Sequence, residues 1–138
     1  MPAILHLATA SLLSTLENNL IIDLESGSDF VEALKIKISN IQELQELCTA
    51  IKAEGCPYKF ITIDTVTALE EMAKPLALAL YRKTPAGLND VMTKDVLTLA
   101  HGMGYGFLRT AVEKIIGMVA ECTTNVIIVG HVKDKAIV

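Results

Sequence analysis

Short runs of apolar residues recur along the chain, and residues that favour turns bound each of them. The clearest runs are Leu20–Leu24, Phe60–Ile63 and Val126–Val129. They are rich in β-branched side chains and apolar almost throughout, which is typical of strands buried on both faces. A further strand is predicted at Ala3–Leu7, leading into a helix that continues through Leu16. These runs predict a mostly parallel sheet.

Segments with helical periodicity separate the predicted strands. One begins after Asn40, which forms a capping-box signal with the glutamate three residues later, and it closes at Gly55. A second spans Val66–Arg82 and contains Pro75, so we expect a kink or a break there. A third spans Tyr105–Glu121. Strands that alternate with helices predict an α/β fold, with the helices packed on the faces of the sheet.

Residues 83–104 show no clear periodicity, and they form the longest predicted loop. Val96–Leu99 could form a short strand or a turn inside this loop. Gly102–Gly106 looks like a glycine-rich phosphate cradle, but it lacks a lysine and a confident preceding strand. We interpret it as a flexible hinge.

Composition places the chain in the range of one globular domain over residues 1–138. Its residues are 51% hydrophobic but only 4% aromatic, without Trp, so the core must consist of Leu, Ile, Val and Ala. Twelve Lys and Arg against sixteen Asp and Glu give a net charge of −4. This balance excludes the uniformly positive surface of a dedicated duplex-DNA binder.

Cysteine usage and the N-terminal sequence indicate the cellular compartment in which the protein is expected to reside. The three cysteines are an odd number without a C-x-x-C pair, which argues against a disulfide framework or a structural zinc site. Residues 1–16 lack the basic start of a signal peptide, and His6 interrupts their apolar run. No charge-free run reaches the roughly 20 residues that a membrane span needs. We expect a cytoplasmic protein without a membrane segment.

Residues capable of chemistry follow the predicted strands. In open α/β sheets, ligands bind beyond the carboxyl ends of the strands, so these positions would gather at one edge. Carboxylates with a histidine and lysines suit a phosphate group and a divalent metal. The residues are Asp23 and Glu25 after the first clear run, Asp64 and Thr65 after the second, and His131, Lys133 and Lys135 after the third.

Each of the main candidates has a second interpretation. Phe60–Asp64 has the form of a Walker B strand, whose terminal carboxylate holds Mg²⁺ through water, but Asp64 could instead cap the following helix. Glu25 could be a general base for attack by water, or a solvated loop carboxylate. His131 could sense a phosphate or orient a water, or make a local hydrogen bond at the surface.

A second type of site is conceivable around the long loop. Tyr105 could stack on bases of single-stranded nucleic acid, with Lys83, Lys94 and Arg109 contacting its backbone. Alternatively this is a polar loop in which Tyr105 and Phe107 anchor the following helix.

Four strings resemble one family over most of the chain. They are LIIDLESGSDFVEALKIKI from Leu20, GCPYKFITIDTVTALEEM from Gly55, TPAGLNDVMTKDVLTLAHGMGYGFLR from Thr84 and NVIIVGHVKDK from Asn125. Together they resemble the phage-type AAA nucleotide-binding proteins, a RecA-like family found in phages and prophages and often grouped with single-strand annealing recombinases. The resemblance implies a three-layer RecA-like core that binds ATP and Mg²⁺.

The resemblance also implies roles for individual residues. Asp64 falls on the Walker B aspartate, which holds Mg²⁺ through water, and Thr65 follows it in the nucleotide site. Glu25 falls on the acidic residue that activates water, and His131 on the residue that senses the γ-phosphate. Lys133 and Lys135 fall where they could reach phosphate in the same or a neighbouring subunit. Because RecA-like proteins place nucleotide between subunits, a homo-oligomer is expected.

One departure from the family changes the expected function. The P-loop, G-x-x-x-x-G-K-[ST], should lie just before Leu16, but residues 1–15 contain neither Gly nor Lys, and no Gly-Lys dipeptide occurs anywhere. Each lost charge-assisted phosphate contact costs roughly 1.5–3 kcal/mol. Against the family pattern the chain also looks shortened at both ends. We expect a degenerate or truncated member with weak or no ATP hydrolysis. The alternatives are an active Mg-ATPase of DNA recombination, and a scaffold that oligomerises or binds single-stranded DNA.

Overall fold

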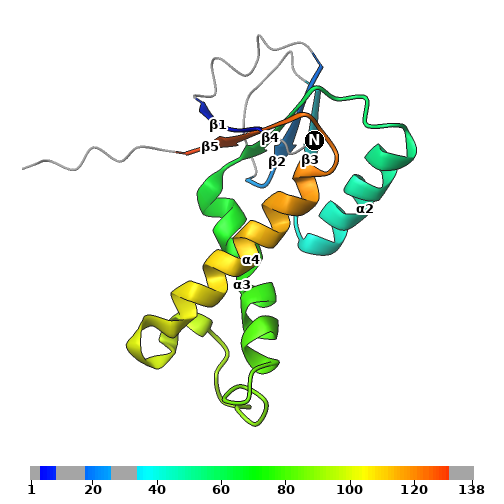
Figure 1. The fold of residues 1–138 in the computed structure, drawn as a ribbon. Helices are drawn as coiled ribbons and strands as arrows, with labels where there is room; N and C mark the ends of the chain where they lie inside the picture. The colour runs from blue at the N-terminus through cyan, green and yellow to red at the C-terminus, as the bar shows by residue number, and fades with distance from the viewer. Residues whose placement is uncertain (1–3, 9–17, 26–33, 131–138) are drawn as a thin grey trace, which may run out of the picture.

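The computed structural model of the protein describes residues 4–8, 18–25 and 34–130. Its centre is a parallel sheet of five strands in the order β1-β5-β4-β2-β3 (Figure 1). The strands are β1 (Ile4–Ala8), β2 (Asn19–Asp23), β3 (Leu34–Lys37), β4 (Phe60–Asp64) and β5 (Asn125–Val129). The predicted α/β fold with a mostly parallel sheet is confirmed.

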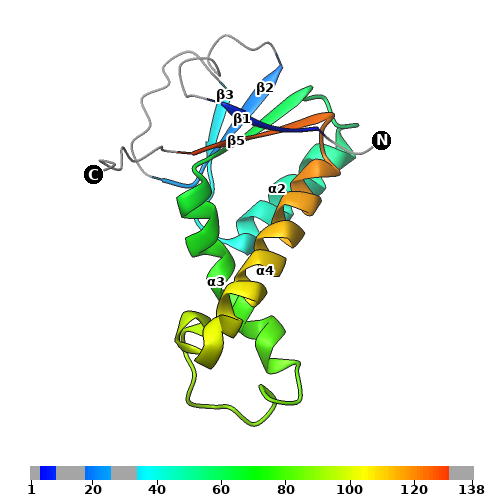
Figure 2. The same ribbon diagram turned by 60° about the vertical axis from the view of Figure 1, so that its left-hand side comes forward.

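Three described helices pack on one face of this sheet. They are α2 (Ile41–Ala53), α3 (Val66–Arg82) and α4 (Met103–Ala120). Figures 1 and 2 show α3 and α4 side by side, running away from the sheet and joined at their far end by residues 83–102. Two short 3₁₀ turns, η1 (Val96–Thr98) and η2 (Ala100–Gly102), lie in that connection.

The central strands β2, β4 and β5 are buried on both faces of the sheet. Alternate strand residues, such as Ile22, Ile63 and Ile128, pack into one core with the helices. The residues that point the other way are also buried, and Ile21 and Thr62 have no exposed surface. Burial on both faces is what a three-layer RecA-like core requires, and it explains why the central strands are apolar almost throughout.

The edge strand β3 was not predicted. Its sequence, Leu-Lys-Ile-Lys, alternates apolar and charged residues, and Leu34 is 57% exposed. An edge strand pairs on one side only and is less deeply buried, so it lacks the continuous apolar run that identified the other strands.

The predicted N-cap at Asn40 is confirmed, and Glu43 reaches back as in a capping box, but to the N–H of the preceding Ser39. The Glu43 backbone N–H donates to Asn40 Oδ1 at 2.9 Å, and the Ser39 N–H donates to Glu43 Oε2 at 3.2 Å. The helix ends at Ala53, just before Gly55, whose φ of +83° is a left-handed conformation that glycine adopts without steric cost.

Of the kink or break expected at Pro75, the break does not occur, since α3 continues through this residue to Arg82. Pro75 lies on the exposed side of the helix. The opposite side buries a stripe that includes Leu69, Ala73 and Ala77, and α3 packs against α4. Because α3 is packed both before and after Pro75 in the sequence, this packing offsets the loss of one helical hydrogen bond at the proline.

The glycine-rich segment Gly102–Gly106 forms the start of α4. A Cβ atom on Gly104 would lie 1.7 Å from the carbonyl oxygen of Val96. Gly104 therefore lets α4 approach the backbone of η1, so at least this glycine serves close packing rather than phosphate binding. Val96–Leu99 was expected to form either a short strand or a turn, and the structure has a turn there, η1.

Candidate functional site

The carboxyl ends of all the described strands lie in one row. Ala8 is in register with Val129, Val129 with Asp64, Asp64 with Asp23, and Asp23 with Lys37. The segments that follow β1, β2, β4 and β5 therefore start from the same edge of the sheet. The predicted gathering of strand-end residues is correct for Glu25, Asp64 and Thr65.

Two buried carboxylates lie next to each other in this row. Asp64 is 6% exposed and Asp23 is 2% exposed. Asp23 Oδ1 accepts a hydrogen bond from the Glu25 N–H at 3.0 Å, and Asp23 Oδ2 is 3.3 Å from Lys35 Nζ. This ion pair compensates the desolvation of the Asp23 carboxylate.

Thr65, rather than Asp64, is the N-cap of α3. Thr65 Oγ1 accepts a hydrogen bond from the Ala68 N–H at 3.4 Å, and the Thr65 backbone is extended, as an N-cap residue requires. The alternative in which Asp64 caps this helix is therefore wrong. The Asp64 carboxylate ends a buried strand without that structural task.

Glu25 is held at the same edge by Thr65. The Thr65 hydroxyl donates to Glu25 Oε1 at 2.7 Å, and the backbone N–H of Leu24 donates to the Asp64 carbonyl at 2.9 Å. Glu25 itself is exposed. The predicted Glu25, Asp64 and Thr65 thus come together, with one exposed carboxylate positioned beside two buried ones.

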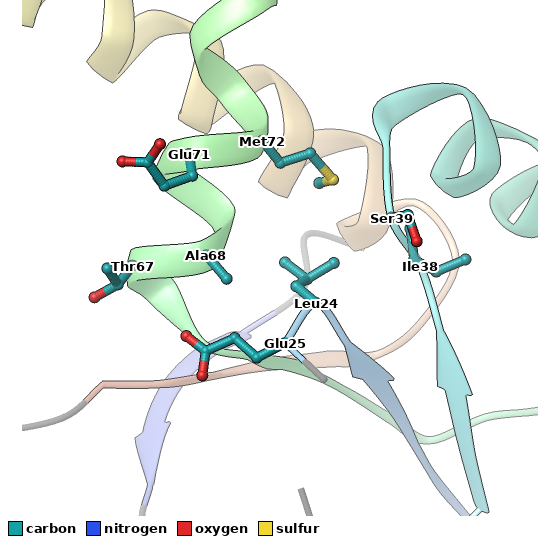
Figure 3. Close-up of a pocket in the computed structure, with 8 residues that line it drawn as sticks. All are labelled: Leu24, Glu25, Ile38, Ser39, Thr67, Ala68, Glu71 and Met72. Atoms are coloured by element: carbon teal, nitrogen blue, oxygen red, sulfur yellow. The ribbon is translucent and has the colours of Figure 1, made fainter. Parts of the chain in front are cut away.

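A cleft of about 440 Å³ opens beside Glu25, between the ends of β2 and β3 and the first half of α3 (Figure 3). Figure 3 shows the oxygens of Glu25, Thr67 and Glu71 along one side, while Leu24 and Met72 form an apolar part. The remaining lining residues are Ile38, Ser39 and Ala68.

Among the described residues, neither Lys nor Arg lines this cleft, and the carboxylates of Glu25 and Glu71 would repel a phosphate. Lys74 Nζ, 2.7 Å from Glu71 Oε1, neutralises part of this charge, and Lys35 is engaged by Asp23. Carboxylate oxygens suit Mg²⁺ better, although the described residues contain no group of three or more His, Cys, Asp or Glu side chains able to hold a metal directly.

Some predicted site residues lie outside the described residues. These are His131, Lys133 and Lys135, and also residues 9–15, where a P-loop would follow β1. Because β1 and β5 end in the same row as Asp64, both segments begin at this edge.

The four candidate nucleic-acid residues are not all brought together. Tyr105 and Arg109, one turn apart on α4, line a cleft of about 430 Å³. Lys83 follows the end of α3 and Lys94 lies in the long loop, and neither lines this cleft. Tyr105 and Arg109 share the cleft with three carboxylates, which weakens its attraction for a nucleic-acid backbone. The carboxylates belong to Glu70, Glu71 and Glu113.

Sequence reasoning missed two residues of the acidic edge. The sequence places Asp23 after its strand without assigning it to the site, and no sequence pattern indicates Lys35, which pairs with it. The signal for Asp23 was present, since it follows an apolar run as Asp64 does. Lys35 could not be found, because the pairing of β3 with β2 was not predicted.

Comparison with known proteins agrees with this geometry. A family model described as an AAA domain matches residues 10–137, nearly the whole chain. Searches of curated proteins and of solved structures gave no significant match. The match covers all the strands except β1, together with the acidic edge at Asp23, Glu25 and Asp64. The chain belongs to the AAA domain family.

Proposed function

We propose that this chain is a RecA-like member of the P-loop NTPase class, from a phage or prophage, that acts in DNA recombination or metabolism and hydrolyses little or no ATP. The observation that carries the proposal is an imbalance at one edge of the sheet. Carboxylates of the kind that a nucleotide site uses lie there, while the sequence lacks the glycines and the lysine of a P-loop.

The carboxylates at this edge of the sheet support descent from a RecA-like nucleotide-binding protein. Asp64 ends β4 as a Walker B aspartate would, and Glu25 is fixed two residues beyond β2 by the Thr65 hydroxyl at 2.7 Å. If Mg²⁺ were bound with nucleotide, Asp64 would hold it through water. Glu25 is exposed, so it could accept a proton from an attacking water.

The missing P-loop residues support the loss of ATP hydrolysis. The chain has no Lys or Arg before Lys35, and Lys35 forms an ion pair with Asp23. Thr9–Glu17, directly after β1, offers hydroxyls but no Gly and no Lys. Without the amide cradle and the lysine, most of the affinity for a triphosphate is lost.

Self-association is part of the proposal. RecA-like proteins place nucleotide between subunits, and this chain has a parallel sheet with carboxylates along one edge. A member that no longer hydrolyses nucleotide would still serve as an assembly scaffold. Sedimentation velocity on the purified chain tests this part, and a clean monomer at high concentration would remove it.

Calorimetric titration with Mg-ATP, paired with an ATPase assay, tests the enzymatic part. We expect binding weaker than about 1 mM and no hydrolysis above background, because several phosphate contacts are missing. Glu25→Gln should change neither result, and Glu46→Gln on the exposed face of α2 is the matched control.

The opposite outcome is equally specific. Magnesium-dependent hydrolysis that disappears in Glu25→Gln but persists in Glu46→Gln would establish the active Mg-ATPase instead. The proposal of a weakly active or inactive member would then be wrong, although the assignment of Glu25 to the site would stand.

A further inference from the structure

The free end of the α3–α4 hairpin carries a concentration of exposed apolar residues. Of the six large apolar side chains that are exposed in the described residues, five lie between positions 88 and 105. Leu88, Val91 and Met92 are 68%, 71% and 84% exposed. Contiguous exposed apolar surface with a polar rim marks interaction sites in soluble proteins.

An apolar cleft of about 590 Å³ opens at the same end of the hairpin. Pro85 and Ala86 line it from the loop after α3, and Met103 and Phe107 line it from α4. Phe107 is fixed by an edge-on contact with Tyr81, with ring centroids 5.6 Å apart, so the floor of the cleft is preformed. We call this cleft, together with Leu88, Val91 and Met92, the tip surface.

The charges around the tip surface are mainly positive. Residues 82–114 contain five Lys and Arg against three Asp and Glu, in a chain whose net charge is −4. Lys83 precedes the lining residue Thr84, and Lys114 follows Thr110, another lining residue, by one turn of α4. Arg109 and Glu113 both line the other cleft, which leaves four basic residues and two acidic ones in this stretch. Asp90 accepts hydrogen bonds within its loop and Asp95 caps η1, and both keep their negative charge.

From this apolar floor and positive rim we propose that the tip surface binds a polypeptide segment that is apolar on one side and acidic on the other, such as an amphipathic acidic helix. Two adjacent helices form a groove of the kind into which such a segment lays its apolar side. Met92 and Met103 have unbranched, adaptable side chains suited to this contact. Figure 2 shows that the end of the hairpin lies away from the sheet, so a segment bound there would be held away from the sheet too.

Two other occupants fit the charges less well. Tip-to-tip pairing of two copies would bring two positive rims together, which is unfavourable. Single-stranded nucleic acid would need aromatic side chains for stacking beside basic residues. Tyr105 lies beside Arg109 and Lys74, but in the other cleft, where three carboxylates outnumber these two cations.

Fluorescence anisotropy with the full-length chain tests the proposal. The probe is a labelled peptide of about 16 residues, with Leu and Phe at helical spacing and Glu elsewhere. The controls are a peptide of the same composition with shuffled spacing, and one with Lys in place of Glu. We expect the first peptide to bind more tightly than both, with an affinity that falls as salt rises.

Surface variants locate the site. Met92→Ser with Met103→Ser, and separately Lys83→Glu with Lys114→Glu, should each weaken binding at least about tenfold. Leu34→Ser and Lys37→Glu, at exposed positions of β3 away from the tip, are the matched controls and should bind as the unaltered chain does.

Three results would overturn the proposal. One is peptide binding that is absent at low salt or unchanged by the tip variants. Another is an oligonucleotide that binds and displaces the peptide, which would assign the tip to nucleic acid. The third is an oligomer in sedimentation that dissociates in the Met92→Ser, Met103→Ser variant, which would assign the tip to a second copy of the chain.

Discussion

Asp90 shows at the scale of one residue how a single carboxylate organises a loop without regular structure. Its Oδ2 accepts hydrogen bonds from the hydroxyls of Tyr81 and Thr93, both at 2.6 Å. Its Oδ1 accepts from the backbone N–H groups of Met92 and Thr93, at 3.1 and 3.0 Å. The loop after α3 is thereby tied to the end of the helix.

These contacts predict a pH-dependent stability. Hydrogen bonds hold the pKa of Asp90 well below its ordinary value of 3.8. The largest effect comes from the Thr93 hydroxyl, followed by the Tyr81 hydroxyl and then by the backbone amides of Thr93 and Met92. A carboxyl group with a lowered pKa in the folded state stabilises that state above its unfolded pKa, and this contribution is lost as the pH falls below about 4. Asp90→Asn should therefore lower the free energy of unfolding at pH 7 and make less difference at pH 3.

Urea unfolding of both proteins at the two pH values measures this difference, with Glu46→Gln as the control for a lost exposed charge. Amide exchange at Met92 and Thr93 should also quicken in Asp90→Asn. A difference in unfolding free energy that is the same at both pH values would contradict the assignment.

Thr65 is a second residue whose side chain shapes the site, because it both caps α3 and holds Glu25. The sequence D-T before a helix does not say which of the two side chains caps it, because both are good N-cap residues. The backbone decides, since the Thr65 side chain reaches the Ala68 N–H. Its hydroxyl hydrogen then points to Glu25, a contact between residues 40 positions apart that no local pattern contains.

At the scale of elements, two glycines of the same helix should respond oppositely to alanine. Gly104→Ala would place a methyl group within 1.7 Å of the Val96 carbonyl, so we expect a loss of about 1–3 kcal/mol in the free energy of unfolding. Gly117→Ala meets nothing within 4 Å, so better helix propensity should add up to about 1 kcal/mol.

Chemical denaturation of both variants checks this pair. Because the two substitutions add the same methyl group to α4, their difference isolates the contact between α4 and η1. Equal effects of the two substitutions would mean that α4 can move away from η1 without cost.

The predicted elements succeeded or failed according to how much they depend on distant partners. Central strands and the α2 cap are encoded locally, by continuous apolar runs and by Asn40 with Glu43. The strand β3 depends on pairing with β2, and the continuity of α3 at Pro75 depends on packing against α4. Neither partner can be seen from the local sequence.

At the scale of the whole molecule, the cysteines report on the core. Cys48 and Cys122 are buried where α2 meets the end of α4, with Cys122 Sγ 3.6 Å from the Cys48 carbonyl oxygen. Burial, and secondarily Cys122, raises the pKa of the Cys48 thiol to about 12, and burial also raises the pKa of Cys122. Cys56 is exposed.

The native chain should therefore show one fast thiol towards an aromatic disulfide reagent and two slow ones, because the thiolate is the reactive form. In urea, the slow pair should become reactive together with global unfolding, which mass spectrometry of labelled peptides can follow. Equal rates for all three thiols in the native protein would show that the α2–α4 contact opens locally.

The sequence by itself determined the class of fold, the order of the central strands and helices along the chain, and the missing phosphate loop. Each of these follows from local apolar runs, capping residues or the absence of Gly and Lys. Only the tertiary structure decided which strand ends meet, because the order β1-β5-β4-β2-β3 follows from pairing between distant segments. That pairing set Asp23 beside Asp64, and it brought Glu25 to Thr65. The folding of residues 83–102 between α3 and α4 likewise left an apolar tip that periodicity could not reveal.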